Sequence, residues 1–222
     1  MLTRTNFLDR EMTELRESLL LMVELNHQML QRGSKSMEEH AMFHKDEIHR
    51  SEQDIDQINK IIQKRVLELL SYEQLALTQV KGLFLFAKIA RDLERVGDHI
   101  INIIVIAPVD TVPGMVSESF SQFMKNVGKM LDALKHGILK EDRQALKWIY
   151  KKEDPEVNQL NRISFMRITE SLQLDQLGAD SGGRLILMSR FFERLADHVS
   201  NAAKDYRHYL KECHSSIKRP TL

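Results

Sequence analysis

The sequence is poor in the residues that cross-link or interrupt a chain. Its single cysteine, Cys213, excludes an internal disulfide in these 222 residues and falls far short of a cysteine-based zinc site, which indicates a reducing compartment. Only 4 prolines and 9 glycines leave few places for turns, so the regular elements must be long. Long elements with few breaks favour helices.

An excess of charge of one sign is also missing. Lysine plus arginine and aspartate plus glutamate each number 32, so bulk attraction to nucleic acid is not expected to drive function. The most apolar run, Ile100 to Val109, is about half of the roughly 20 residues needed to span a bilayer. The N-terminal residues are charged where a signal peptide needs an apolar segment, so we expect a cytoplasmic protein.

What the sequence does contain is typical of a folded helical protein. Hydrophobic residues make up 42% and recur at helical spacing, while two prolines and a glycine between Ala107 and Gly114 predict a linker. The pattern predicts an all-α fold of two three-helix bundles, at residues 1–107 and 114–222. The predicted helices, with breaks that include Gly33 and Gly137, are 8–31, 36–70, 75–106, 115–136, 140–173 and 182–212.

The two halves repeat one another. The stretch from Arg91 to Asn102 aligns without gaps on the stretch from Arg190 to Asn201, with six of twelve positions identical at a constant offset of 99 residues. The middle helices repeat more faintly at an offset of 102, where Glu52 matches Asp154. The repeat predicts that one three-helix unit occurs twice in the chain.

Both copies carry carboxylates at helical spacing. At about 100° per residue, Glu94 and Asp98 share a strip opposite the apolar side of their helix, and the preceding helix carries a similar strip. Two such strips could converge in a shallow surface groove, and carboxylate oxygens suit hard cations such as magnesium, manganese or ferric iron. The candidate metal ligands are Glu52, Asp56, Glu94 and Asp98 in the first half and Asp154, Glu193 and Asp197 in the second.

A solvated helix face is the plainer interpretation of these carboxylates. In a chain with 32 acidic residues, pairs four residues apart are expected from composition alone, and Arg95 and Arg194 could form ion pairs with them. Against this, solvent-exposed residues have no packing reason to repeat a Glu-Arg-x-x-Asp-His-x-x-Asn pattern. His99 and His198 lie off the strip, and we expect them to pack or hydrogen-bond rather than bind metal.

The segments Asp92–His99 and Phe192–His198, each followed by a matching asparagine, resemble the PhoU family. The resemblance extends over nearly the whole chain as two tandem repeats. It implies two three-helix bundles, with multinuclear metal sites on the surface at the repeated acidic motifs. It also implies a role in phosphate homeostasis at the inner face of the membrane. Members negatively regulate phosphate uptake by coupling a phosphate ABC transporter to a membrane sensor kinase, as adaptors and not enzymes.

The implied partners are therefore that phosphate ABC transporter and phosphate sensor kinase, and no nucleic acid. The implied cofactor is a metal ion, which the sequence does not narrow beyond iron, zinc, manganese or magnesium. A homodimer is left open. A metal-dependent enzyme is the less favoured alternative, because the sequence shows no nucleophile pairing or poised acid and base.

The sequence departs from the family pattern at three places. Asn158 stands where aspartate is usual, and Pro155 is expected to force Asp154 into an extended backbone, so that Asp154 caps a helix instead of binding metal. The stretch Gln79–Phe84 replaces a motif common in stand-alone members. This last departure is also similar to the PhoU-like cytosolic domain of sodium/phosphate symporters, so a regulatory domain acting on a symporter membrane domain is the alternative function.

Overall fold

The regular elements are helical throughout the computed structural model, which describes residues 4–39, 45–72, 75–108 and 112–217. The all-α prediction is therefore confirmed for this part of the chain. The elements are α1 (Arg4–Glu39), α2 (Lys45–Leu70), α3 (Leu77–Ile106), α4 (Gly114–Leu139), α5 (Arg143–Trp148), the π-helical turn η2 (Ile149–Glu153), α6 (Asp154–Gln173) and α7 (Ala179–Ile217). The segments α5, η2 and α6 form one continuous helical stretch.

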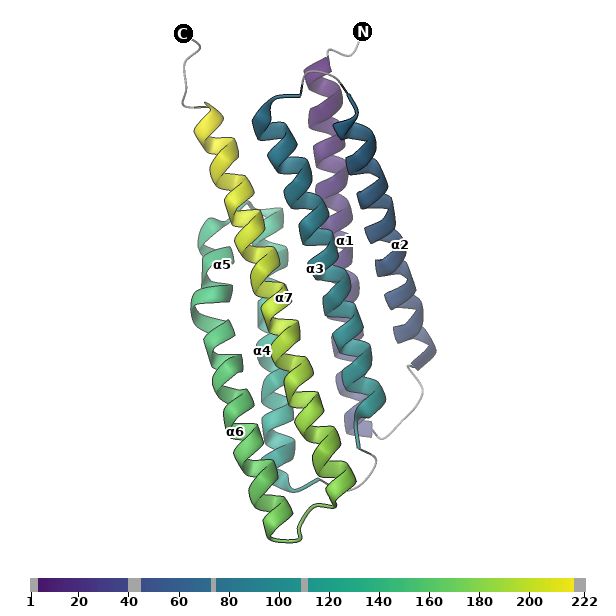
Figure 1. Cartoon of the computed structure of the whole chain (residues 1–222), viewed down its shortest axis with the longest axis vertical. Coiled ribbons are helices and arrows are strands. Elements are labelled where there is room, and N and C mark those ends of the chain that lie inside the picture. Colours follow the sequence, from purple (N-terminus) through teal and green to yellow (C-terminus); the bar gives the residue numbers. More distant parts are fainter. Residues whose placement is uncertain (1–3, 40–44, 73–74, 109–111, 218–222) are drawn as a thin grey trace.

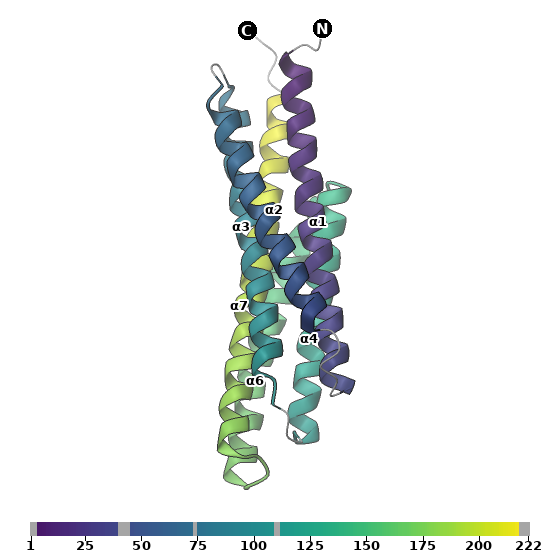
Figure 2. The same cartoon turned by 90° about the vertical axis from the view of Figure 1, so that its right-hand side faces the viewer.

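The helices form two three-helix bundles that lie side by side along a shared long axis (Figure 1). Helices α1, α2 and α3 pack on one another, and α4 packs with α6 and α7. The most extensive helix pair is α3 with α7, which joins the two bundles (Figure 1). In Figure 2 the first bundle faces the viewer and α3 lies in front of α7. The proposed division of the chain at residues 107 and 114 stays a prediction, since residues 109–111 lie outside the described ranges.

Buried apolar side chains at helical spacing explain why each helix packs as it does. In α3 the fully buried side chains recur every three or four residues, so one face of the helix enters the core. The opposite face carries Glu94 and Asp98, which are only partly buried. The members of the buried face are Leu83, Phe86, Ile89, Ala90, Leu93, Val96, Ile100 and Ile103.

The contact between α3 and α7 is reciprocal. The His198 ring stacks on His99, with centroids 5.5 Å apart, and its Nδ1 lies 2.9 Å from Asp92 Oδ1, while His99 also stacks on Phe191 at 5.7 Å. Asp92 and Phe191 are equivalent positions of the repeat, so each histidine meets the same position of the opposite helix, as expected for helices related by a two-fold axis. Both histidines pack or hydrogen-bond, as predicted.

Burial decides the charge of His99 in this contact. It lowers the pKa of His99 to about 4, and the neighbouring His198 acts in the same direction, so His99 is neutral near pH 7. Asp92 and His198 form one polar contact between α3 and α7, and ion pairs of Lys81 with Glu212 and of Lys88 with Asp205 are two others.

Asp92→Ala should lower the free energy of unfolding by about 1–3 kcal/mol, because His198 would lose its partner in a partly buried interface. Urea denaturation followed by circular dichroism measures the change. Asp9→Ala, at an exposed carboxylate on α1, is the matched control and should be close to neutral. An equal effect of the two substitutions would contradict the anchoring role of Asp92.

Two predicted helix breaks are wrong. Helix α1 runs through Gly33 to Glu39, and α4 runs through Gly137 to Leu139. A Cβ atom would stand 2.8 Å from Ile104 Cδ1 at Gly33 and 2.5 Å from Leu146 Cδ2 at Gly137. These glycines therefore allow close helix packing instead of ending a helix.

The expectation for Asp154 is also wrong. Asp154 has helical angles of φ −60° and ψ −47°, and its backbone N–H donates to Ile149 O across a wide π turn. A proline ring would normally collide with the carbonyl four residues before it, and the wider turn provides the room that Pro155 needs. The helix therefore continues through Pro155, and Asp154 is part of the helical stretch instead of an extended residue before it.

Candidate functional site

The first acidic strip consists of Glu52, Asp56, Glu94 and Asp98, on α2 and α3, which pack side by side. All four residues are partly buried, with 20% of the Glu94 side chain and 31% of the Asp98 side chain exposed. This partial burial places the strip at the surface of the bundle and not in the core, as the helical spacing predicts.

The carboxylates of the two helices are close enough to influence one another. Burial, followed by the charges of Asp98 and Asp56, raises the pKa of Glu52. Burial and Asp98, with a smaller contribution from Asp56, likewise raise the pKa of Glu94. Since each glutamate responds to an aspartate on the other helix, the two predicted strips converge.

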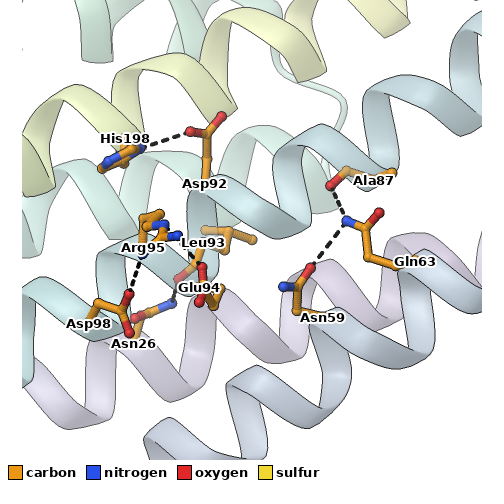
Figure 3. A network of polar contacts seen from close by, with 10 residues as sticks. All are labelled: Asn26, Asn59, Gln63, Ala87, Asp92, Leu93, Glu94, Arg95, Asp98 and His198. Carbon is orange, nitrogen blue, oxygen red and sulfur yellow. Dashed lines mark hydrogen bonds and ion pairs between the residues drawn. The ribbon is translucent and has the colours of Figure 1, made fainter.

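Cations of the protein itself partly neutralise this strip. Arg95 Nη1 lies 3.0 Å from Asp98 Oδ2, and Arg95 Nε lies 3.5 Å from Glu94 Oε2 (Figure 3). Lys60 Nζ lies 2.6 Å from Asp56 Oδ2. The pKa of Glu94 is nevertheless raised, so burial and repulsion between carboxylates outweigh the attraction of Arg95.

Side-chain amides hold the helices around the strip in place. Gln63 Nε2 donates to Ala87 O at 2.8 Å and so ties α2 to α3 (Figure 3). The fully buried Asn26 donates its Nδ2 to Leu93 O at 2.9 Å and ties α1 to α3 one residue before Glu94. We did not predict Asn26 as a supporting residue; a lone amide among buried apolar positions of α1 was the available signal.

The second acidic strip consists of Asp154, Glu193 and Asp197, on α6 and α7. Burial, then Asp197 and to a smaller extent Glu193, raises the pKa of Asp154, so these carboxylates also converge. Asp154 Oδ1 is buried without a hydrogen-bond partner, whereas Glu193 is paired with Arg190. Asn158 donates its Nδ2 to Asp154 O at 3.1 Å, so it is engaged with the backbone of its own helix.

The carboxylate oxygens of both strips are suitable ligands for a hard cation, although the side chains are not arranged around one. Mutual repulsion at both strips and the unpaired Asp154 Oδ1 are features that a bound cation would relieve. Within the ranges that the structure describes, however, no three His, Cys, Asp or Glu side chains stand close enough to hold a metal ion. Binding therefore requires carboxylates to rotate inward and Arg95 to turn away, and metal binding stays a prediction.

The fold and its paired acidic strips define a class of duplicated three-helix-bundle proteins. Residues 8–107 match the family model described as the PhoU domain. Curated relatives with 22% identity are the phosphate-specific transport system accessory protein PhoU homolog of Clostridium acetobutylicum and homolog 1 of Thermotoga maritima. The match to the first relative covers 91% of this chain and 93% of that protein. The match to the second covers 89% of this chain and 86% of that protein.

Solved structures show the same fold. The phosphate transport system regulatory protein PhoU from Streptococcus pneumoniae superposes with a TM-score of 0.80 at 20% identity, over 92% of this chain and 96% of that chain. PhoU from Pseudomonas aeruginosa superposes with a TM-score of 0.82 at 17% identity, over 91% of this chain and 98% of that chain. The first bundle therefore matches a PhoU domain, and the chain is similar to PhoU proteins over about nine-tenths of its length.

Proposed function

We propose that the chain regulates phosphate uptake and phosphate-starvation signalling as an accessory protein of a membrane phosphate transport system. The observation that carries this proposal is the match to two curated accessory proteins of phosphate-specific transport over about nine-tenths of the chain. Both bundles and both acidic strips fall within this match, so the likeness includes the whole candidate site.

The proposed mode of action is binding and not turnover. The acidic strips are partly exposed on the outside of the bundles, where a large partner can reach them. The raised pKa values of Glu52 and Glu94 follow from partial burial and from the neighbouring carboxylates, and a bound cation would relieve this repulsion. The proposed partners are a phosphate ABC transporter and its sensor kinase.

A metal ion is part of the proposal. Glu52, Asp56, Glu94 and Asp98 would hold it in the first bundle, and Asp154, Glu193 and Asp197 would do so in the second. The ion would supply positive charge between facing carboxylates and so link α2 to α3, and α6 to α7. Carboxylate ligands are compatible with iron, zinc, manganese or magnesium.

The proposed location is the inner face of the membrane, by attachment to a partner. Among the described residues, none of the helices combines the length and the apolar character that crossing a bilayer requires.

Tagged protein at its native level should co-purify from detergent-solubilised membranes with subunits of a phosphate ABC transporter or with its sensor kinase. Quantitative mass spectrometry against an untagged strain measures the enrichment. Enrichment of a sodium/phosphate symporter instead would favour the alternative function. Absence of any phosphate transport or sensing protein from both crosslinked and uncrosslinked preparations would count against the proposal.

A further inference from the structure

A surface groove of about 490 Å³ runs between α6 and α7, within the range of about 300–1,000 Å³ typical of ligand pockets. Its apolar lining includes three large side chains that are more than half exposed: Phe165 at 51%, Met166 at 61% and Leu187 at 54%. Grouped apolar exposure of this kind on a folded protein marks a contact surface more often than isolated apolar residues do.

The internal repeat shows that the fold does not need apolar residues here. At the same offsets that align the acidic strips, the first bundle carries polar residues where the second carries this apolar group. The equivalent pairs are Gln63 and Phe165, Lys64 and Met166, and Lys88 and Leu187. In the first bundle Gln63 donates to Ala87 O and Lys88 pairs with Asp205, whereas neighbouring buried positions such as Ile89 and Met188 are apolar in both copies.

The same comparison explains a free positive charge at the groove. Lys60 in the first bundle is paired with Asp56, one helical turn before it. The equivalents in the second bundle are Arg162 and Asn158, so the carboxylate is lost and Arg162, which lines the groove, pairs with no other described residue. Arg190 lies on the opposite side of the groove, where it forms an ion pair with Glu193. The apolar floor is thus flanked by two guanidinium groups.

We propose that this groove between α6 and α7 binds an amphipathic helix of a partner protein, with apolar side chains in the groove and carboxylates facing Arg162 and Arg190. A helix bound in a groove places apolar residues every three or four positions along one face, and this face would fit the groove between α6 and α7. Acidic residues at the edges of the partner helix would supply a carboxylate for Arg162, since Asn158 stands where the first bundle has Asp56.

Two other occupants fit the groove less well. A membrane surface favours apolar side chains that protrude, whereas this group lines a hollow between helices. A second copy of the chain, paired through the same face about a two-fold axis, would bring two copies of Arg162 and Arg190 into one interface. An acidic partner helix removes that repulsion.

This proposal rests on the proposed accessory function in one respect, which is that the chain acts by binding another protein. It is tested on purified protein with a displayed library of helical peptides, selected on the wild type. The key variant, Phe165→Gln with Met166→Lys and Leu187→Lys, installs the residues that the first bundle already carries at these positions, so the fold should tolerate it. Leu67→Thr, which exchanges a 69% exposed leucine on α2 for its repeat equivalent, is the matched control.

Enriched peptides should combine apolar residues at a spacing of three and four with net negative charge. In fluorescence anisotropy, the triple variant should bind them at least about tenfold more weakly than the wild type, and Leu67→Thr should bind them equally well. Replacing glutamate by lysine in the peptide, or Arg162 by Gln in the protein, should also weaken binding. Circular dichroism checks that each variant keeps its helicity.

Several results would overturn the proposal. These are failure to enrich any peptide, enriched peptides without acidic residues, and unchanged binding by the folded triple variant. Flotation with anionic phosphatidylglycerol vesicles that only the triple variant loses would assign the groove to a membrane. A dimer in sedimentation that only the triple variant loses would assign it to a second copy. None of these results would by itself remove the phosphate function, which is measured in cells.

Discussion

Replacing Glu94 and Asp98 together by alanine should remove most of the metal that we propose the first bundle binds, and should weaken its affinity for that metal by at least about 100-fold. These residues supply both α3 carboxylates of the first acidic strip, and the two from α2 would be left without facing donors. Loss of an outer-shell partner alone typically costs a metal site about 10–100-fold, so loss of two direct ligands should cost no less. Elemental analysis after desalting and calorimetric titration measure the change.

The variant should keep its fold, because both side chains lie on the solvated side of α3 and Asn26, Gln63 and the buried face remain. Glu14→Ala with Glu17→Ala, which removes two exposed carboxylates from α1, is the matched control and should retain the metal. If wild-type protein refolded with iron, manganese, zinc or magnesium retains none, the strip is an ion-pair ladder with Arg95 and Lys60. The structure already contains those ion pairs.

The features that sequence predicts well here are those set by periodicity within one helix. The acidic side chains Glu94 and Asp98 are four residues apart and opposite Leu93 and Val96, which fixes them outside the core once a helix forms. The duplication then transfers this result to the second bundle. Helix spacing could therefore place both strips at the surface before any tertiary structure was considered.

The features that sequence missed depend on contacts between distant segments. Gly33 reads as a helix break, yet it packs on Ile104 of α3, and that close approach is invisible along α1 alone. The pairing of Asp92 with His198 joins residues of different repeats. One signal in the sequence did set Asp92 apart: its equivalent in the second motif is Phe191, although most of the two motifs match.

Ion pairs between helices show the same limit. Glu11 is 5% exposed and is held by Arg65, which joins α1 to α2 across more than fifty residues of sequence. Burying a carboxylate is costly unless a cation meets it, so this pair has to form for α1 and α2 to pack. Composition supplies many candidate partners for Glu11, and only the fold selects one.

Deleting the gene in its own organism should raise phosphate uptake and expression of phosphate-starvation genes in phosphate-rich medium to the levels of starved wild-type cells. The reason is the proposed adaptor role, in which the chain would transmit a state between two membrane proteins, so that its removal would leave the transporter without an inhibitory contact. Radiolabelled phosphate uptake and transcript levels measure the effect. The wild-type gene, supplied in trans at native level, should restore repression.

The most direct test of the regulatory claim is the initial rate of phosphate uptake in phosphate-rich medium, compared among wild-type, deletion and complemented strains. A regulatory role predicts a high rate of uptake in the deletion strain and a return to the wild-type rate on complementation. Equal uptake in all three strains, with phosphate-starvation genes repressed in each, would contradict it.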